Sequence, residues 1–544
     1  MPRFHSAITE QSSKPLSWTD ASGNTYSYYE HPFLKSVLFI LGQELCERLA
    51  YYGLTPNLQT FLKEFAGMDD SGANSYISIF NSIIYLTPLV SAALSDTILG
   101  LYVTIVVFSL IYACGLVLLT LSAIESISEQ WMIDVALLFL IALGAGGIKS
   151  CVNIMGAQQF HPEHHRDLIT RYYTYFYATI NVGSIIGGIV SPILVQECSF
   201  FVAFLFITIV FLCACAVFLS GGILGRYVKP KPQGSAVLKV VEVIGVACTK
   251  FSFEKCKKSK GGRFEDSFIE DTKCLLRLVP MFTIVIPFQM VYTQMTTAFL
   301  TQATKMDTNT FGWDMPAAMF QNVDPFAVII NSLILDQVVF PFLQRRNRMP
   351  SVLGRFCLGC IAGGCSLLCA MGLEYAVMAK PLFTISAWWQ VPQFWLIALG
   401  ECFLFATSYE VAFTYSPGQL KACASGLNLL FFSFGSMLSA VLFQVCSPWL
   451  PDFKPDDPST WGGSHYDYYY MVLIGFCVLG AIGSLALIPY FNRVAAANLA
   501  VAERDAEQPK KEAGPADSYD FDGESSKSAV KSDRVDDLEN QVLA

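Results

Sequence analysis

The chain has 544 residues, of which 53% are hydrophobic and 15% charged, and its mean hydropathy is +0.46. Soluble globular proteins carry about 25% charged residues, so this composition excludes an ordinary soluble domain. The net charge of −9 comes largely from the segment after Arg493, and the 17 cysteines, most of them in apolar runs, indicate neither a disulfide framework nor a zinc site.

Apolar runs of membrane-spanning length, about 20 residues each, recur along the chain. They predict an all-α polytopic membrane protein with twelve transmembrane helices, six on each side of a long polar loop. The predicted helices cover 33–62, 73–97, 102–122, 131–156, 167–196, 199–220, 276–302, 323–345, 351–375, 390–417, 421–446 and 466–491.

This division predicts the domain organisation. We expect an N-terminal tail at 1–32, a six-helix bundle at 33–220, a linker with an amphipathic helix at 221–275, a second bundle at 276–491 and a disordered acidic tail at 492–544. The stretch from Arg226 to Arg277 carries twelve Lys and Arg residues, which places the linker and both tails in the cytoplasm. The lysines of this linker could bind anionic lipid, but an ordinary positively charged cytoplasmic loop would have the same composition.

The polar residues of the first predicted helix share one face. Glu44, Glu47 and Arg48 are spaced i, i+3 and i+4, and Tyr51 and Tyr52 extend that face by a turn. Three ionisable groups in a membrane helix are energetically costly unless they pair or line a hydrated cavity. A structural ion pair or a helix end among headgroups would explain them, but the cluster favours a proton or substrate site.

Two six-helix halves around a polar middle indicate a secondary transporter of the major facilitator type, with its site between the halves. The sequence has no P-loop, which would indicate ATP-driven transport. It also has no channel selectivity filter and no nucleophile–base or metal motif of an enzyme.

Residues 44–53, ELCERLAYYG, resemble the ExxER(F)xYYG signature of the proton-dependent oligopeptide transporter family, called the peptide/nitrate transporter family in plants. The resemblance continues in order over about 33–491, through segments at 85–89, 95–100, 143–149, 176–184, 392–401 and 409–413. It implies the major facilitator fold and a proton-coupled symporter that acts as a monomer in a bilayer, without a cofactor, metal or nucleic acid.

The resemblance assigns the proton-coupling group to Glu44, Glu47, Arg48 and Lys149 of the fourth predicted helix. Arg48 and Lys149 would hold a peptide carboxylate or another anion. An intramembrane lysine ordinarily has a partner or a substrate. Such a mixed cluster can exchange a proton for a substrate anion, which is the physical basis of proton coupling.

In the second half, Glu410 of the tenth predicted helix would hold the peptide amino terminus, assisted by Thr414 one turn later. A protonated Glu410 bonded to a neighbouring helix is the structural alternative. Glu401, nine residues earlier, also matches a family glutamate and is expected to be secondary. Opposite charges on the two halves suit a zwitterion that bridges them.

Other positions have weaker assignments. Tyr177 and Asn181 match the family's amide-binding pair, but a helix–helix hydrogen bond would equally explain the asparagine. Tyr51 and Tyr52 would stack on substrate side chains or simply pack. Asp324 stands where the family often has Asn, as a substrate contact, a helix cap or a replacement acid.

The seventh predicted helix departs from the family pattern. Thr293, a predicted substrate contact, stands where many relatives carry an acid for gating and proton release, so the expected proton relay is interrupted. Tyr292 falls where one plant nitrate transporter has its nitrate-binding His, which weakens a nitrate interpretation.

Three functional hypotheses remain from the sequence. The first is a proton-coupled symporter in the plasma membrane that imports di- and tripeptides by alternating access. The second is a proton-coupled transporter of nitrate or another small organic anion or solute. The third, motivated by the long acidic tail, is a nutrient receptor that binds without transporting.

Overall fold

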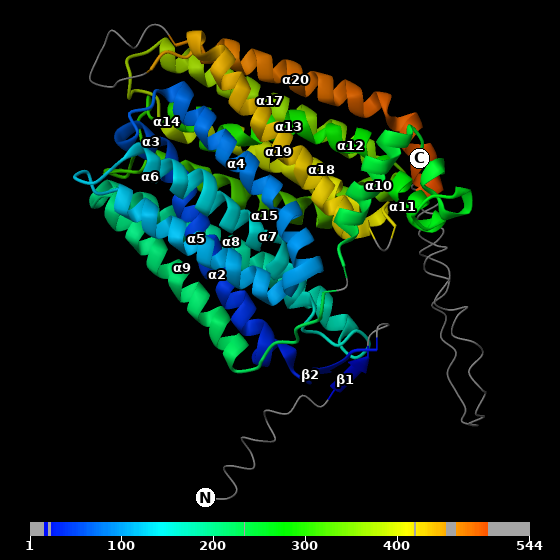
Figure 1. Ribbon diagram of the computed structural model, residues 1–544. Helices are drawn as coiled ribbons and strands as arrows, with labels where there is room; N and C mark the ends of the chain where they lie inside the picture. Colours follow the sequence, from blue (N-terminus) through cyan, green and yellow to red (C-terminus); the bar gives the residue numbers. More distant parts are fainter. Residues whose placement is uncertain (1–15, 20–22, 233, 418–419, 453–463, 499–544) are drawn as a thin grey trace, which may run out of the picture.

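The computed structural model describes residues 16–19, 23–232, 234–417, 420–452 and 464–498. Its helices form two bundles that lie side by side, the first drawn blue to green and the second green to orange (Figure 1). The predicted all-α fold with two helical bundles is confirmed.

The N-terminal bundle begins with a π-helical turn at Phe33–Val37 that continues into α2. Side-chain caps start two of its helices, because Asp69 accepts from the Gly72 amide and Ser199 from the Val202 amide. The helices are α2 (Leu38–Leu54), α3 (Leu58–Phe65), α4 (Asp70–Leu94), α5 (Gly100–Ser122), α6 (Gln130–Asp134), α7 (Ala142–Ala157), α8 (Arg166–Glu197) and α9 (Phe200–Ile223).

The C-terminal bundle is more broken, since its first span consists of three short helices separated by turns. Ser351 caps its longest helix by accepting from the Gly354 amide. The helices are α12 (Val279–Thr283), α13 (Val285–Tyr292), α14 (Ala298–Ala303), α15 (Val323–Ile334), α16 (Phe340–Arg345), α17 (Val352–Met378), α18 (Val391–Thr414), α19 (Lys421–Cys446) and α20 (Tyr466–Ala486).

Length and composition make most of these helices suitable for crossing a membrane. Among the described residues nine helical stretches qualify, or ten if the bent pair Asp266–Thr283 and Val285–Ala303 is one span. One stretch, Asp70–Ser122, contains both α4 and α5, whereas α2, which has 17 residues and three charged side chains, is not in the set. If the bent pair is counted as one span, α2 is included, and α4 and α5 are counted separately, the described helices account for the twelve predicted spans.

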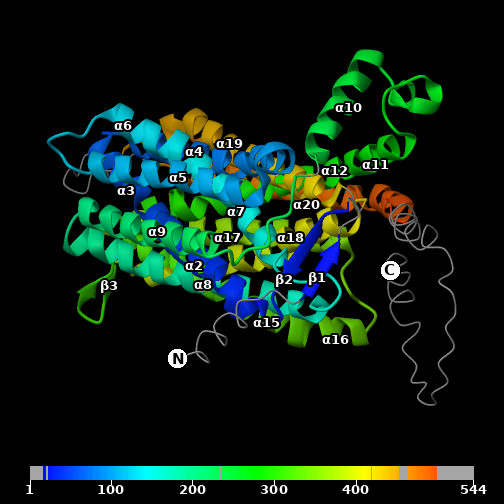
Figure 2. The same ribbon diagram turned by 60° about the horizontal axis from the view of Figure 1, so that its bottom comes forward.

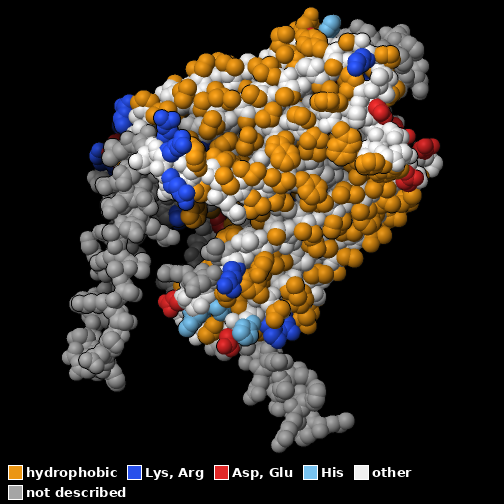
Figure 3. All heavy atoms as spheres, turned by 180° about the vertical axis from the view of Figure 1, so that it is seen from behind, with side chains coloured by type: hydrophobic (Ala, Val, Ile, Leu, Met, Phe, Trp, Pro, Cys, Tyr) orange, Lys and Arg blue, Asp and Glu red, His pale blue; other side chains and the backbone are white. Residues whose placement is uncertain are grey.

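The surface agrees with a membrane environment. Hydrophobic side chains cover the long flank seen in Figure 3, and the charged side chains gather at its ends. Several large apolar residues of the helices are more than half exposed, including Ile209, Val338 and Leu479. Such an extended apolar surface is stable against lipid tails and unfavourable in water.

One end of the molecule carries structure outside the bundles. The linker forms α10 (Ala236–Lys250), as the amphipathic pattern predicts, and α11 (Asp266–Leu276). The N-terminal segment also contains a hairpin of β1 (Leu16–Thr19) and β2 (Thr25–Tyr28), which its polar composition did not indicate. Figure 2 shows β1, β2, α10 and α11 at one end and α3 and α6 at the other.

The last span extends past its predicted boundary. Residues 488–498 are helical, whereas the tail was expected to begin at 492. Asn498 is buried and its amide donates to the carbonyls of Cys274 and Tyr415, while Val494 and Ala495 are buried beside it. This docking holds the segment in place. The rest of the predicted tail, and residues 1–15, lie outside the described residues.

Hydrogen bonds join the two bundles near α3 and α14. Gln59 Nε2 donates to Thr301 Oγ1 at 2.5 Å, and Asn322 Nδ2 donates to the Gly188 carbonyl at 2.8 Å. Small hydroxyl residues also bring α4 and α19 together, since Ser75 donates to the Ala440 carbonyl. The bundles are therefore closed at the end opposite β1, β2, α10 and α11 (Figure 2).

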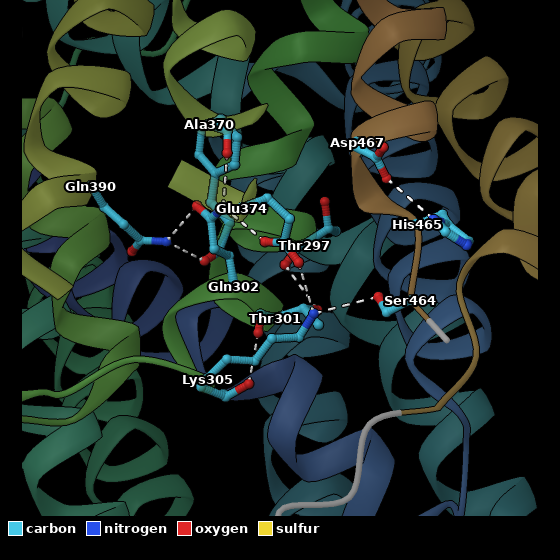
Figure 4. A network of polar contacts seen from close by, with 12 residues as sticks. Thr297, Thr301, Gln302, Lys305, Ala370, Glu374, Gln390, Ser464, His465 and Asp467 are labelled. Carbon is cyan, nitrogen blue, oxygen red and sulfur yellow. Dashed lines mark hydrogen bonds and ion pairs between the residues drawn. The ribbon is translucent and has the colours of Figure 1, made fainter. Parts of the chain in front are cut away.

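A buried polar network holds α14 at this closed end (Figure 4). Lys305 Nζ donates to Glu374 Oε1 at 3.0 Å, and Gln302 donates to Glu374 Oε2 at 2.9 Å. The amide of Gln390 in turn donates to Gln302 Oε1 at 3.1 Å. The network ties α14 to α17 and to the start of α18, and α14 carries the Thr301 that Gln59 contacts.

Candidate functional site

The predicted ionisable cluster on α2 is assembled and buried. Arg48 Nε donates to Glu44 Oε1 at 2.8 Å and lies 2.6 Å from Glu47 Oε2, and no side chain of the three is more than 5% exposed. Glu44 Oε2 and Glu47 Oε1 have no hydrogen-bond partner among the described residues. With all three charged, the cluster has a net charge of −1, so one proton on either glutamate neutralises it.

Glycines on α8 let that helix pack directly on the cluster's helix. A Cβ added at Gly187 would lie 2.2 Å from the Leu49 carbonyl oxygen, and one added at Gly183 would lie 2.7 Å from the Leu45 carbonyl oxygen. No side chain fits in these spaces without moving a backbone. Close packing of α8 on α2 therefore depends on these two glycines.

Lys149 on α7 projects toward the cluster from a second helix. Its ammonium lies 4.6 Å from the centroid of the Tyr85 ring, in cation–π range. It lies within electrostatic range of Arg48, Glu47 and Glu401. Among the described residues no ion pair involves Lys149. The lysine is therefore an available cation next to a cluster with excess negative charge.

Both bundles line a cavity of about 250 Å³. Arg48 lies behind its wall, with the guanidinium 6.0 Å from the Tyr51 ring centroid. The cavity brings together most of the predicted substrate residues, namely Tyr51, Tyr52, Lys149, Tyr177, Asn181, Thr293 and Asp324.

Two of these residues have defined polar contacts. Asn181 Nδ2 donates to the Tyr177 carbonyl at 2.8 Å, a bond within α8, so its side chain is not engaged by a neighbouring helix there. Thr293 Oγ1 donates to the Met290 carbonyl at 2.8 Å and lies 3.0 Å from Ser439 Oγ. Thr293 thus helps join α13 to α19 and presents no acid to the cavity.

Glu410 and Thr414, predicted to hold the peptide amino terminus, are not among the cavity-lining residues. Glu410 is 44% exposed and forms a two-point ion pair with Arg355, at 2.7 and 3.0 Å. Glu401 lines the cavity instead. The reason is helical geometry, because nine residues at about 100° each put Glu401 and Glu410 on opposite faces of α18.

Sequence reasoning also missed several polar residues in the cavity wall. They are Asn81, Tyr85, Gln289, Gln321 and Asn322, with Glu401 given too small a role. Glu401 stands in an apolar helix without a nearby basic residue, a sequence feature that could have indicated a binding site. The amides carried no such signal, since membrane helices often use them in helix–helix hydrogen bonds.

The cavity is more accessible from the end that bears β1, β2, α10 and α11. α8 bonds to the C-terminal bundle near Gly188, toward its C-terminus. Toward its N-terminus, Tyr173 and Tyr177 are 45% and 51% exposed. The structure is thus one state of a molecule closed at the opposite end. Within the described ranges, no group of three or more His, Cys, Asp and Glu residues is placed to hold a metal ion.

Comparisons with known proteins agree on one family. Residues 102–449 match the family model described as PTR2, POT family, a stretch that includes Lys149 and Glu401. Protein NRT1/PTR FAMILY 8.5 of Arabidopsis thaliana is 28% identical over 84% of this chain and 89% of that protein. The probable peptide transporter ptr2 of Schizosaccharomyces pombe is 31% identical over 73% of this chain and 71% of its own length.

Solved structures show the same fold. The crystal structure of the POT family transporter PepTSo has a TM-score of 0.72 at 22% identity and covers 84% of this chain and 98% of its own. An auto-inhibited POT family peptide transporter has a TM-score of 0.70 at 22% identity, over 84% of this chain and 96% of its own. The chain therefore belongs to the POT family and is a multi-pass membrane transporter rather than an enzyme.

Proposed function

We propose that the chain is a proton-coupled symporter that imports di- and tripeptides by alternating access. The observation that carries this proposal is the pair of opposite charges across the cavity, with Lys149 on the N-terminal bundle and Glu401 on the C-terminal bundle. A short peptide is a zwitterion, so its carboxylate would bind Lys149 and its ammonium Glu401. A ligand held by both bundles couples binding to their relative movement.

The proton site in this proposal is the cluster behind Lys149. Glu44 and Glu47 share one arginine, which leaves one carboxylate charge uncompensated in a buried position. A proton removes that cost, and an ion pair between Lys149 and the nearest carboxylate also removes it. A substrate carboxylate that draws Lys149 into the cavity would therefore favour proton binding in the cluster. Binding of proton and substrate would then be cooperative.

Asn181 and the tyrosines have secondary roles in this proposal. Asn181 Oδ1 would accept from a peptide amide, and Tyr51, Tyr52 and Tyr177 would pack against substrate side chains. The Lys- and Arg-rich linker supports a cytoplasmic position for α10 and α11. The accessible end of the cavity then faces the cytoplasm of a cell whose plasma membrane holds the protein as a monomer.

Uptake into proteoliposomes tests this function. With an inward proton gradient, labelled Ala-Ala and Ala-Ala-Ala should accumulate above the external concentration, and collapse of the gradient with a protonophore should abolish accumulation. Liposomes with protein in which both Lys149→Gln and Glu401→Gln are present serve as the control. A protein that binds dipeptides without moving them, as a receptor would, contradicts the proposal.

Transport of nitrate or another small anion is the second candidate, because several relatives belong to the plant NRT1/PTR family. The cavity favours the peptide, since its lining contains two acids and one lysine. The variant Glu401→Gln separates the two. Peptide uptake should collapse in this variant, whereas uptake of an anion that binds Lys149 should survive or rise.

A further inference from the structure

Two carboxylates from neighbouring helices face the same cavity. Asp324 near the start of α15 and Glu401 in the middle of α18 both line it. Asp324 is 9% exposed, and neither Asp324 Oδ1 nor Glu401 Oε2 has a hydrogen-bond partner among the described residues. Contacts between Cys402 and α15, at Ser332 and the Val328 carbonyl, hold the two helices together at this level.

The two acids have too few counter-charges. Lys149 is the single basic residue that lines the cavity among the described residues, and it lies within electrostatic range of Glu401 and the α2 cluster. Arg48 is engaged by Glu44 and Glu47. One peptide ammonium would offset one of the two acids, and the other would remain buried without a partner, which is unfavourable.

Aromatic rings complete the surroundings of the two acids. Tyr52 from α2 and Tyr292 from α13 line the cavity and lie within electrostatic range of both Asp324 and Glu401. A ring face attracts an ammonium or a guanidinium group, and the attraction grows where water is excluded. Two carboxylates and two tyrosines in one cavity wall favour cations over a neutral or acidic group.

We propose that Asp324 makes the cavity selective for substrates with two positive groups, in particular short peptides that contain Lys or Arg. Glu401 holds the amino terminus, and Asp324, with the faces of Tyr52 and Tyr292, holds the cationic side chain. This inference rests on the proposed peptide function and adds the class of peptide. It assigns Asp324 the role of a specificity-determining residue.

Competition for uptake tests the inference in proteoliposomes with the full chain. Transport of labelled Ala-Ala is measured against unlabelled Ala-Lys, Ala-Arg, Ala-Ala and Ala-Glu. For the unaltered protein we expect half-inhibition by Ala-Lys and Ala-Arg at concentrations about tenfold below that for Ala-Ala, and by Ala-Glu at higher concentrations than for Ala-Ala. Equal inhibition by all four peptides overturns the inference.

Two variants test whether the preference for cationic dipeptides depends on the Asp324 carboxylate. In Asp324→Asn the ratio between Ala-Ala and Ala-Lys should fall to about one, and in Asp324→Glu, which keeps the charge, a preference for Ala-Lys should remain. Asp336→Asn is the matched control, because Asp336 follows on the same helical segment, is exposed and does not line the cavity. It should keep both the uptake and the preference.

The outcomes separate this inference from the proposed function. Uptake of Ala-Ala without a preference for cationic peptides, or with a preference that survives in Asp324→Asn, overturns the inference alone. If no dipeptide is taken up by the unaltered protein, the proposed function and this inference both fail. If the two acids share one proton instead of binding a second cation, Ala-Lys and Ala-Ala compete equally, and the inference is again overturned.

Discussion

The C-terminal bundle contains buried acids in two opposite environments. Near α14, Glu374 accepts from Lys305 and Gln302, and the lysine and the glutamate are at most 3% exposed. In the cavity, Asp324 and Glu401 have carboxylate oxygens without partners among the described residues and no ion pair. Buried charges are retained where neighbours compensate them or where a ligand does. The first acid is therefore compensated within the protein, and we propose that a ligand compensates the other two.

The same contrast separates the closed end of the molecule from the cavity between the bundles. The Lys305–Glu374 network anchors α14, whose Thr301 accepts from Gln59 of the other bundle at the closed end. The cavity acids line the space between the two bundles. A transporter needs such a difference, because one region has to keep its shape while the other changes partners during the cycle. The following experiments test this division.

The largest effect is expected from Glu374→Gln. This change leaves Lys305 buried without its ion-pair partner, which typically costs about 3–5 kcal/mol. The unfolding temperature in detergent should fall by several degrees and the yield of folded protein should drop. The double variant Lys305→Met with Glu374→Met should recover most of the stability, and exposed Lys380→Met should leave it unchanged. An unchanged unfolding temperature in Glu374→Gln would contradict a structural role.

Glu401→Gln should lower peptide uptake without lowering the unfolding temperature, the opposite of Glu374→Gln. Loss of a charge-assisted hydrogen bond to the peptide ammonium is worth about 1.5–3 kcal/mol, so Ala-Ala uptake should fall roughly ten- to a hundredfold. The unfolding temperature without substrate should stay the same or rise, because a partly buried acid without a counter-charge has been removed. Measurement of the unfolding temperature and of uptake on one preparation distinguishes a binding role of Glu401 from a structural one. A loss of stability that parallels the loss of uptake would make Glu401 structural as well.

Glu47→Gln should uncouple transport from the proton gradient. The amide keeps the shape of the side chain and removes a carboxylate that takes the proton in the proposed cycle, so counterflow exchange of dipeptide should continue. Gradient-driven accumulation should fall by about tenfold or more, equivalent to about 1.4 kcal/mol. Comparison of counterflow with uptake under an imposed pH gradient measures the difference. Accumulation at the original level would exclude Glu47 from coupling.

Glu410→Gln should have the smallest effect. Glu410 is 44% exposed and paired with Arg355, and such pairs contribute about 0–1 kcal/mol. Peptide uptake should stay within about twofold of the unaltered protein, in contrast to Glu401→Gln on the same helix. A collapse of uptake in Glu410→Gln with retention in Glu401→Gln would reverse the assignment of the two glutamates.

Much of the architecture was predictable because membrane helices are encoded locally. Each span is a continuous apolar run, and its backbone satisfies its own hydrogen bonds, so composition alone indicates where it lies. The Glu44, Glu47 and Arg48 cluster was also predictable, since spacing along one helix places the three side chains on one face. The β1–β2 hairpin and the helical residues 492–498 were not, because contacts with distant segments stabilise them.

The helices, the family resemblance and the charged groups available for a site could all be predicted from the sequence. Which of those groups meet depends on how the faces of separate helices are turned toward one another, and only the three-dimensional structure shows this. It paired Glu410 with Arg355, paired Glu374 with Lys305, and left Glu401 and Asp324 facing the cavity. Glu401 and Glu410 stand in the same apolar helix, so their sequence context does not separate them, and the partners that do lie tens of residues away.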